Sequence, residues 1–327
     1  MIDITTQFAG LKLKNPIIIS SSGLTNSAEK NQKLAEAGAG AIVLKSLFEE
    51  QIVLEIEKVI DTVYYPEGVE YLEGYIREHA LSEYLNLVRD SKAVCDIPVI
   101  ASINCHTNTT WTEFAAHIEQ AGADALEINI LSLPSIGNYE YGSFEQLHID
   151  ILREIKQSIG IPVIMKLGSN FTNPVALIEQ LYANGAAAVV LFNRFYPVDI
   201  DIEHLTHKTG DVLSHPADLS DSLRWVGIAS SVVNKMEYAV SGGVHAPADV
   251  AKSLLAGASA VEICSTIYRH GNAYIEEMLT FLQEWMQRHG FTHIAQFNRT
   301  LNSKDIRGIN MFERTQFLKY FSNGTPT

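Results

Sequence analysis

The sequence predicts a single (β/α)8 barrel over residues 1–327, with an N-terminal hairpin and long active-site loops after the second and sixth strands. A repeated phrase is the first observation behind this prediction. It contains a glycine, small residues and then a run of β-branched residues or leucine. Its four copies are AGAGAIVL from Ala37, AGADALEI from Ala121, NGAAAVVL from Asn184 and AGASAVEI from Ala256. Such a phrase is typical of a helix that ends in a left-handed cap and continues into a buried parallel strand.

A second set of apolar runs, mostly introduced by proline, alternates with these four copies. They read NPIIIS from Asn15, IPVIAS from Ile97, IPVIMK from Ile161 and MEYAVSGG from Met236. Together the two sets give strands that start near residues 17, 41, 98, 125, 162, 187, 237 and 260. Eight buried strands that alternate with amphipathic segments predict a parallel barrel. An open doubly wound sheet is the alternative, but it does not predict the fourfold repeat, and no GxGxxG follows the first strand.

Two connections are too long for a simple helical crossover. One runs from Lys45 to about residue 96, and the other from Asn193 to about residue 235. Both follow the carboxyl end of a strand, where barrels build their active-site loops.

The overall composition predicts a cytoplasmic protein with neither a nucleic-acid nor a membrane partner. The formal net charge of −14 opposes binding to phosphate backbones or anionic lipid. No run approaches about 18 apolar residues, and the first residues do not resemble a signal peptide. The three cysteines have no CxxC or zinc spacing, which favours reduced thiols, and we expect no metal site.

Two lysines close apolar strands and are candidates for the barrel mouth. Lys45, followed by Ser46, ends the second strand, and Lys166 ends the fifth. There an ammonium group can stabilise negative charge on a ligand. A surface lysine that extends past the barrel rim is the alternative for each.

The loops after strands seven and eight predict a phosphate site. Gly242 and Gly243 follow the seventh strand, and Ser265 and Thr266 follow the eighth. Barrels commonly bind phosphate at this pair of loops, through backbone N–H groups and a helix N-terminus.

Other strand ends carry small or amide side chains that suit a flat ligand. Ser22 and Gly23 follow the first strand, where a small-residue turn permits close backbone approach. Asparagines end the third, fourth and sixth strands, and they are Asn104, Asn129 and Asn193. Ser132, in the loop after Asn129, is either a proton relay or an ordinary loop serine.

Taken in order, these residues resemble the dihydroorotate dehydrogenase family, especially its soluble cytosolic class. The likeness runs over nearly the whole chain, from TTQFAGLKLKNPIIISSSG through KS, EIN, VIMKLG, FN, SGGV and ICSTIY. The resemblance implies flavin mononucleotide (FMN) as cofactor. It places Ser22, Gly23, Lys45, Ser46, Asn104, Asn129, Lys166 and Asn193 at the ring or substrate, and Gly242, Gly243, Ser265 and Thr266 at the phosphate.

The resemblance also implies a reaction in pyrimidine biosynthesis. Dihydroorotate loses a proton from C5 and a hydride from C6, which passes to flavin N5, and orotate forms. Ser132 occupies the position of the family's base, with Lys166 as the second catalytic residue. Lys45, Asn129 and Asn193 would bind the substrate. If Ser132 is not the base, Cys105, His106 and Tyr139 are the alternatives.

The substrate half of the family pattern is altered in this chain. The loop that should hold orotate with asparagines reads VYYPEG over residues 63–68, and the family's C-P-N reads Ser132-Leu133-Pro134. Aligned on the proline, Leu133 would take the base position. A related dihydropyrimidine therefore remains an alternative to dihydroorotate.

Partners and competing functions follow from the same observations. The resemblance implies a soluble electron acceptor such as fumarate, with NAD through a partner subunit as the alternative, and a homodimer. A Schiff-base lyase or aldolase that uses Lys45 or Lys166 is a competing function. A flavin-binding protein without orotate turnover is another. A tRNA dihydrouridine synthase shares the flavin barrel, but the charge of −14 disfavours it.

Overall fold

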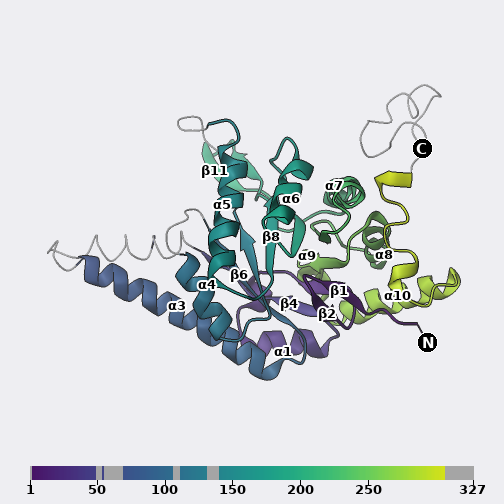
Figure 1. The fold of residues 1–327 in the computed structure, drawn as a ribbon, viewed down its shortest axis with the longest axis horizontal. Helices are drawn as coiled ribbons and strands as arrows, with labels where there is room; N and C mark the ends of the chain where they lie inside the picture. Colours follow the sequence, from purple (N-terminus) through teal and green to yellow (C-terminus); the bar gives the residue numbers. More distant parts are fainter. Residues whose placement is uncertain (1, 49–53, 55–68, 106–110, 131–139, 306–327) are drawn as a thin grey trace.

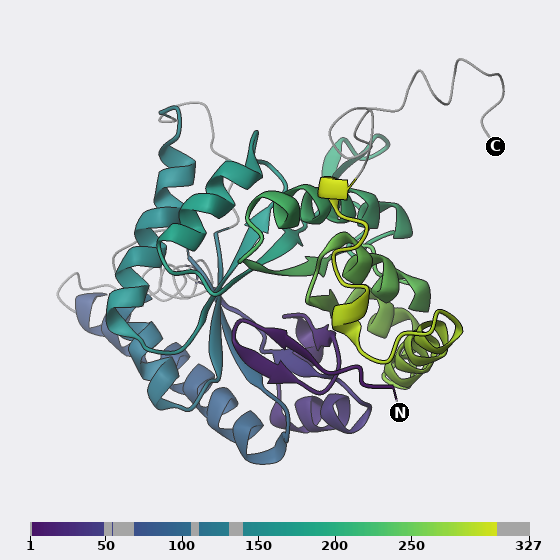
Figure 2. The ribbon, with the colours of Figure 1, turned by 45° about the vertical axis from the view of Figure 1, so that its right-hand side comes forward.

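Eight parallel strands form a closed barrel surrounded by helices (Figures 1 and 2). The structure is a computed structural model that describes residues 2–48, 54, 69–105, 111–130 and 140–305. The barrel strands are β3 (Ile17–Ile19), β4 (Ala41–Val43), β6 (Val99–Asn104), β7 (Ala125–Asn129), β8 (Val163–Gly168), β9 (Ala188–Asn193), β12 (Glu237–Ser241) and β13 (Ala260–Ile263). Each pairs in parallel with the next, and β13 pairs with β3 to close the ring. The predicted (β/α)8 fold is confirmed.

The helices lie outside the strands, as Figure 2 shows. They are α1 (Ala28–Glu36), α3 (Val69–Val94), α4 (Trp111–Gln120), α5 (Ser143–Ser158), α6 (Pro174–Ala183), α7 (Leu219–Val232), α8 (Pro247–Ala256), α9 (Ser265–His270) and α10 (Tyr274–Arg288). Short 3₁₀ turns are η1 (Gly23–Thr25), η3 (Pro216–Asp218), η4 (Ile294–Gln296) and η5 (Ser303–Asp305). Along α10, Ile275, Met278, Leu282 and Met286 are buried.

The repeated phrase forms the helix-to-strand turn that its glycines predict. Gly38, Gly122, Gly185 and Gly257 have φ of +106°, +96°, +92° and +123°. Only glycine adopts such angles without strain. At Gly257 a Cβ would also lie 2.2 Å from the Ser230 hydroxyl, so the turn is closely packed there.

A hairpin at the chain start contributes to the barrel interior. It consists of β1 (Thr6–Phe8) and β2 (Leu11–Leu13), which pair antiparallel, and it confirms the predicted N-terminal hairpin. Phe8 and Leu13 are fully buried against inward-facing strand residues such as Ile18 and Ala41. The interior is therefore packed at this end and does not form a pore.

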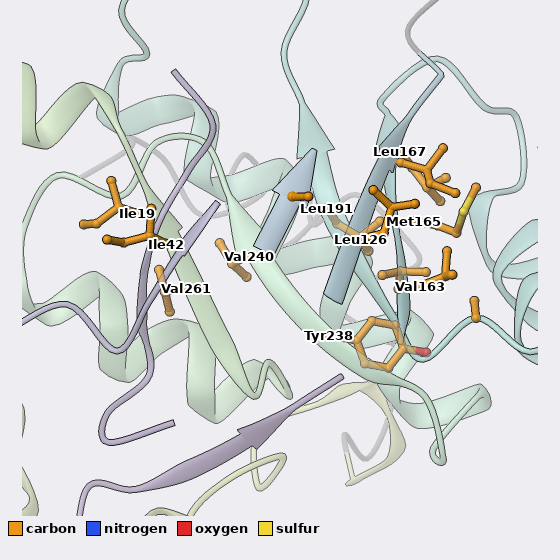
Figure 3. Packing of buried hydrophobic residues seen from close by; sticks show 14 of the residues in the cluster. Ile19, Ile42, Leu126, Val163, Met165, Leu167, Leu191, Tyr238, Val240 and Val261 are labelled. Carbon is orange, nitrogen blue, oxygen red and sulfur yellow. The ribbon is translucent and has the colours of Figure 1, made fainter. Parts of the chain in front are cut away.

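Outward-facing strand residues pack against the helices. On β8, Val163 and Met165 belong to this outer layer, whereas Ile164 between them faces the barrel interior. Figure 3 shows members of the outer layer from several strands, including Leu126 and Tyr238. The alternation follows the period of two along a strand, and it fixes which residues can face the cavity.

The long connection after β9 contains a second hairpin. Here β10 (Val198–Asp201) pairs antiparallel with β11 (Thr206–Thr209) before the chain reaches η3 and α7. The long loop expected after the sixth strand is thus confirmed. After β4, the short strand β5 (Leu47–Phe48) pairs with β6. Residues 49–53 and 55–68 of that connection, with the VYYPEG segment, lie outside the described residues. Among the described helices, none is both long and apolar enough to cross a bilayer.

Candidate active site

The barrel interior changes from apolar to polar one layer before the strands end. On β7 the inward positions run from Ala125 to Glu127, and on β8 from Ile164 to Lys166. The same change occurs on other strands. The buried polar residues of this layer are Ser20, Ser102, Glu127, Lys166, Ser241 and Glu262. A polar layer inside an apolar barrel costs desolvation energy, which points to function at this end.

A cavity of about 620 Å³ lies above this layer, at the carboxyl ends of the strands. Its volume is in the range of small-molecule and cofactor sites. Of the predicted site residues, it is lined by Ser22, Gly23, Lys45, Ser46, Asn104, Asn129, Lys166, Asn193, Gly242, Gly243 and Ser265. The barrel therefore brings these residues together, although they come from segments that are far apart in the chain.

Lys166 is held at the cavity floor by two buried carboxyl groups. Its Nζ lies 2.6 Å from Glu262 Oε2 and 3.5 Å from Glu127 Oε1, and it also donates to Ser20 Oγ at 2.9 Å. Lys166 is 5% exposed, Glu262 2% and Glu127 0%. Burial alone would lower the pKa of Lys166, but the two carboxylates outweigh it and raise that pKa. Lys166 is therefore a fixed cation rather than a free amine, which counts against a Schiff base at this residue.

The pKa values of the two carboxyl groups shift in opposite directions. Burial, reinforced by the nearby charge of Glu262, raises the pKa of Glu127 to about 8. Burial acts in the same sense on Glu262, but the Lys166 ammonium outweighs it and lowers the pKa of that carboxyl. At neutral pH Glu262 is thus the anion of the pair.

A belt of hydrogen bonds links the strand ends on one side of the cavity. Ser46 Oγ lies 2.9 Å from Ser21 Oγ and 2.7 Å from Ser102 Oγ. Asn129 donates to Ser102 Oγ at 3.2 Å, and Asn193 donates to Asn129 Oδ1 at 3.1 Å. The belt orients two of the predicted asparagines. It also satisfies polar groups that would otherwise be buried without partners.

The opposite end of the cavity is formed by glycine backbone. Gly242 and Gly243 have φ of +88° and +73°. A Cβ at Gly243 would lie 2.1 Å from the backbone nitrogen of Leu219, whereas the space at Gly242 is open. The Gly242 backbone is therefore accessible to a ligand, while Gly243 permits the close approach of α7.

Ser214 and Ser265 meet at this end of the cavity. The Ser214 backbone N–H donates to Ser265 Oγ at 2.9 Å, and the Ser214 hydroxyl lies 3.0 Å from His245 Nε2. Burial lowers the pKa of His245, with the Arg269 charge acting in the same direction. His245 is therefore neutral at pH 7 and acts as a hydrogen-bonding support.

Two features of the predicted phosphate site differ from expectation. The Thr266 side chain is fully buried, and its hydroxyl donates to the Val244 carbonyl at 2.8 Å rather than lining the cavity. At the start of α8, the Asp249 carboxylate accepts from the His245 and Ala246 N–H groups at 3.1 and 2.8 Å. That helix N-terminus is thus capped by the chain's own carboxylate.

Lys45 differs from Lys166 in having no carboxylate partner among the described residues. Its Nζ lies 4.6 Å from the centre of the Phe48 ring. Partial burial lowers its pKa. Arg194, at the end of β9, also lines the cavity, and its guanidinium donates to the Asp211 and Val212 carbonyls. The rim therefore presents positive charge to an anionic or electron-rich ligand.

Some residues of the site were not predicted from the sequence, and some predicted candidates lie outside the described residues. Ser132, the proposed base, lies outside the described residues, as do His106 and Tyr139. The roles of Glu127 and Glu262 were missed, although a carboxylate inside an apolar strand is a visible signal. Ser214 was missed because nothing in its loop marks it. In the described part of the chain, no group of three or more His, Cys, Asp or Glu residues could hold a metal.

The arrangement agrees with the comparison to known proteins. The sequence pattern of the dihydroorotate dehydrogenase family matches residues 67–286. The chain belongs to this family. It is 30% identical over 311 residues to the dihydroorotate dehydrogenase B (NAD(+)) catalytic subunit of Thermoplasma volcanium, which covers 90% of this chain and 97% of that protein.

Two further relatives are similar to most of this chain. The corresponding catalytic subunit of Methanocella arvoryzae is 32% identical over 281 residues, with 81% of this chain and 87% of that protein covered. The NAD-dependent dihydropyrimidine dehydrogenase subunit PreA of Escherichia coli is 25% identical over 329 residues, with 93% and 78% covered. The predicted family and the predicted oxidoreductase class are confirmed. The family is flavin-dependent in general.

Proposed function

We propose that this protein oxidises dihydroorotate or a closely related dihydropyrimidine, with FMN bound in the cavity and residues 1–327 acting as one domain. The single observation that carries the proposal is the cavity itself. It combines a fixed Lys166 cation at the floor, amide side chains on one wall and open glycine backbone at the far end. Family membership and the names of the relatives support the reaction class.

The residues fit FMN in size and in chemistry. The cavity volume of about 620 Å³ is large enough for a cofactor of this class. The open space over the Gly242 backbone, beside the hydroxyl of Ser265, suits a phosphate. The N–H groups of Lys166 at the floor suit the edge of a flavin ring that gains negative charge when reduced. When bound, FMN would supply the two-electron acceptor for the substrate.

The chain's own residues would position the substrate and move its proton. Asn129 and Asn193 are oriented by the hydrogen-bonded belt, so their remaining polar atoms can hold the edges of a planar imide. Lys45, which lacks a described carboxylate partner, would attract an anionic substituent such as the carboxylate of dihydroorotate. Ser132 would take the substrate's C5 proton as general base.

The relatives' names bear on the electron acceptor. Several are NAD(+)-type catalytic subunits, and another is a subunit of an NAD-dependent enzyme. These names favour electron transfer to NAD through a partner subunit over a soluble acceptor such as fumarate. Reoxidation of the reduced protein by fumarate alone, at a rate that matches turnover, would reverse this preference and favour an enzyme that needs no partner subunit.

The proposal is tested by anaerobic mixing of the flavin-loaded protein with dihydroorotate, dihydrouracil and dihydrothymine while the flavin absorbance is followed. We expect at least one to bleach the flavin. If none does while dithionite does, the protein binds flavin without oxidising dihydropyrimidines, and the proposed function is wrong. Lys45→Met discriminates among substrates, because it should weaken dihydroorotate, which carries a carboxylate, more than dihydrouracil, which does not.

A further inference from the structure

The carboxyl groups of Glu127 and Glu262 are each incompletely hydrogen-bonded. Glu127 Oε2 and Glu262 Oε1 are buried and have no hydrogen-bond partner among the described residues. Their other oxygens contact Lys166, and Glu127 Oε1 also accepts from Asn129 at 3.4 Å. Lys166 Nζ contacts both carboxyl groups and so holds them at one site, where a hydrogen bond between them would satisfy the unpaired oxygens. Two ionised carboxylates cannot form that bond, because neither has a hydrogen to donate.

The charge balance at the cavity floor also indicates that one of the two carboxyl groups is protonated. Among the described residues, Lys166 is the one cation that contacts the pair, so two ionised carboxylates would leave a net negative charge on three side chains that are each at most 5% exposed. Of the other titratable groups that face it, Tyr84 is buried with its phenol hydrogen-bonded to the backbone of Ser102. Burial raises the pKa of Tyr84 and of Cys264, so both are neutral. An uncompensated buried charge is strongly unfavourable.

We propose that Glu127 and Glu262 share one proton, and that the resulting pair is a positioning group that holds Lys166 as a charge-balanced cation beneath the cavity. The shared proton supplies the missing donor between the two oxygens. It also leaves one negative charge to balance the ammonium. Like-charged carboxyl groups at one site commonly behave in this way, with one proton retained by the pair.

The consequence for the cofactor rests on the proposed function. A balanced floor leaves the flavin ring beside an ammonium whose position is fixed by Ser20 and Glu262, at 2.9 and 2.6 Å. The floor then contributes little net charge to the equilibrium between oxidised and reduced flavin. Lys166 would instead act through the place and direction of its N–H groups.

Infrared spectroscopy of the flavin-free protein tests the shared proton directly. We expect a carbonyl stretch of one buried, neutral carboxylic acid at pH 7, which shifts in deuterated water. It should disappear in Glu127→Gln and in Glu262→Gln and persist in Glu284→Gln, a control on the outer face of α10, where Glu284 is 63% exposed. Absence of the band from the wild-type protein would overturn the proposal without reference to any variant. Because no flavin is needed, this result is independent of the proposed function.

The flavin potential of the loaded protein provides a second test. Each single glutamine variant keeps one carboxylate against Lys166, so the equilibrium between oxidised and reduced flavin should stay within about threefold of wild type. The double variant leaves Lys166 unbalanced and should favour reduced flavin by more than about tenfold, or about 30 mV for a two-electron couple. If both carboxylates are ionised instead, each single variant will already produce a shift of that size, and the proposal fails.

Discussion

Replacing Gly242, Gly243 and Gly290 with alanine separates backbone strain, steric conflict and cofactor contact. All three glycines have left-handed φ, of +88°, +73° and +74°. A Cβ at Gly242 or Gly290 would meet no atom within 4 Å, whereas a Cβ at Gly243 would lie 2.1 Å from the Leu219 nitrogen and 2.7 Å from its Cα. Gly242 lines the cavity, whereas Gly290 follows α10 and is not among the lining residues.

The structure sets the expected free energies of unfolding for this series. Gly290→Ala should cost only the left-handed strain, about 1–2 kcal/mol. Gly242→Ala should cost about the same. Gly243→Ala adds a conflict with the backbone of α7, which cannot rotate away as a side chain can, so its total should reach about 3–5 kcal/mol. Urea unfolding of the flavin-free proteins measures these differences.

The affinity for FMN should follow a different order. The methyl group of Gly242→Ala would project into the proposed phosphate site, so FMN should bind at least about tenfold more weakly, equivalent to about 1.4 kcal/mol. Gly290→Ala should bind FMN as the wild type does. Fluorescence titration of the flavin-free variants gives both values. Equal FMN affinity in the Gly242 and Gly290 variants would refute the phosphate site at this turn.

Three further variants test the floor and the base. Lys166→Met should lower the free energy of unfolding by about 3–5 kcal/mol, because it leaves buried carboxyls without their cation; the same change at exposed Lys33 should cost less than about 0.5 kcal/mol. Ser132→Ala should slow substrate oxidation roughly 10²-fold and leave FMN binding unchanged, whereas Ser135→Ala should do neither. Glu127→Gln should gain stability relative to wild type as pH rises from about 5 to about 8, by about 1.4 kcal/mol per pH unit.

The sign of the Glu127 effect follows from proton binding. The pKa of Glu127 is raised to about 8 in the folded protein, from an ordinary value of 4.5. Between these values the folded wild type binds more protons than the unfolded chain, so its stability falls as pH rises. The glutamine variant lacks this dependence. If the free energies of unfolding of the two proteins change in parallel with pH, Glu127 has an ordinary pKa and the reasoning fails. For the separate Ser132→Ala test, unchanged turnover would move the base to another residue.

The barrel could be predicted from the sequence because its signals are local. Each glycine of the repeated phrase marks a left-handed cap within a few residues of a strand, as at Gly122 and Ala125. The same applies to Lys45 and Lys166, which end apolar runs. Side chains at the carboxyl ends of barrel strands lie at the barrel mouth. Both lysines could therefore be placed at the cavity without any knowledge of the pairing between strands.

The ion pairs of the floor could not be predicted in this way. Glu127 comes from β7, which pairs with β8, but Glu262 comes from β13, and only barrel closure brings it to Lys166. Thr266 shows a further limit of sequence position, since it occupies the predicted loop but directs its hydroxyl to the Val244 carbonyl. Sequence position predicted which loop lies at the cavity. Packing of α9 against the loop after β12 determines which atoms of that loop face it.

A crystal structure of the protein with bound FMN is the most direct test of the account. It should place the phosphate against the Gly242 backbone beside Ser265, and the pyrimidine edge of the ring beside Lys166. A phosphate bound elsewhere, or a ring whose pyrimidine edge points away from Lys166, would contradict the proposed site.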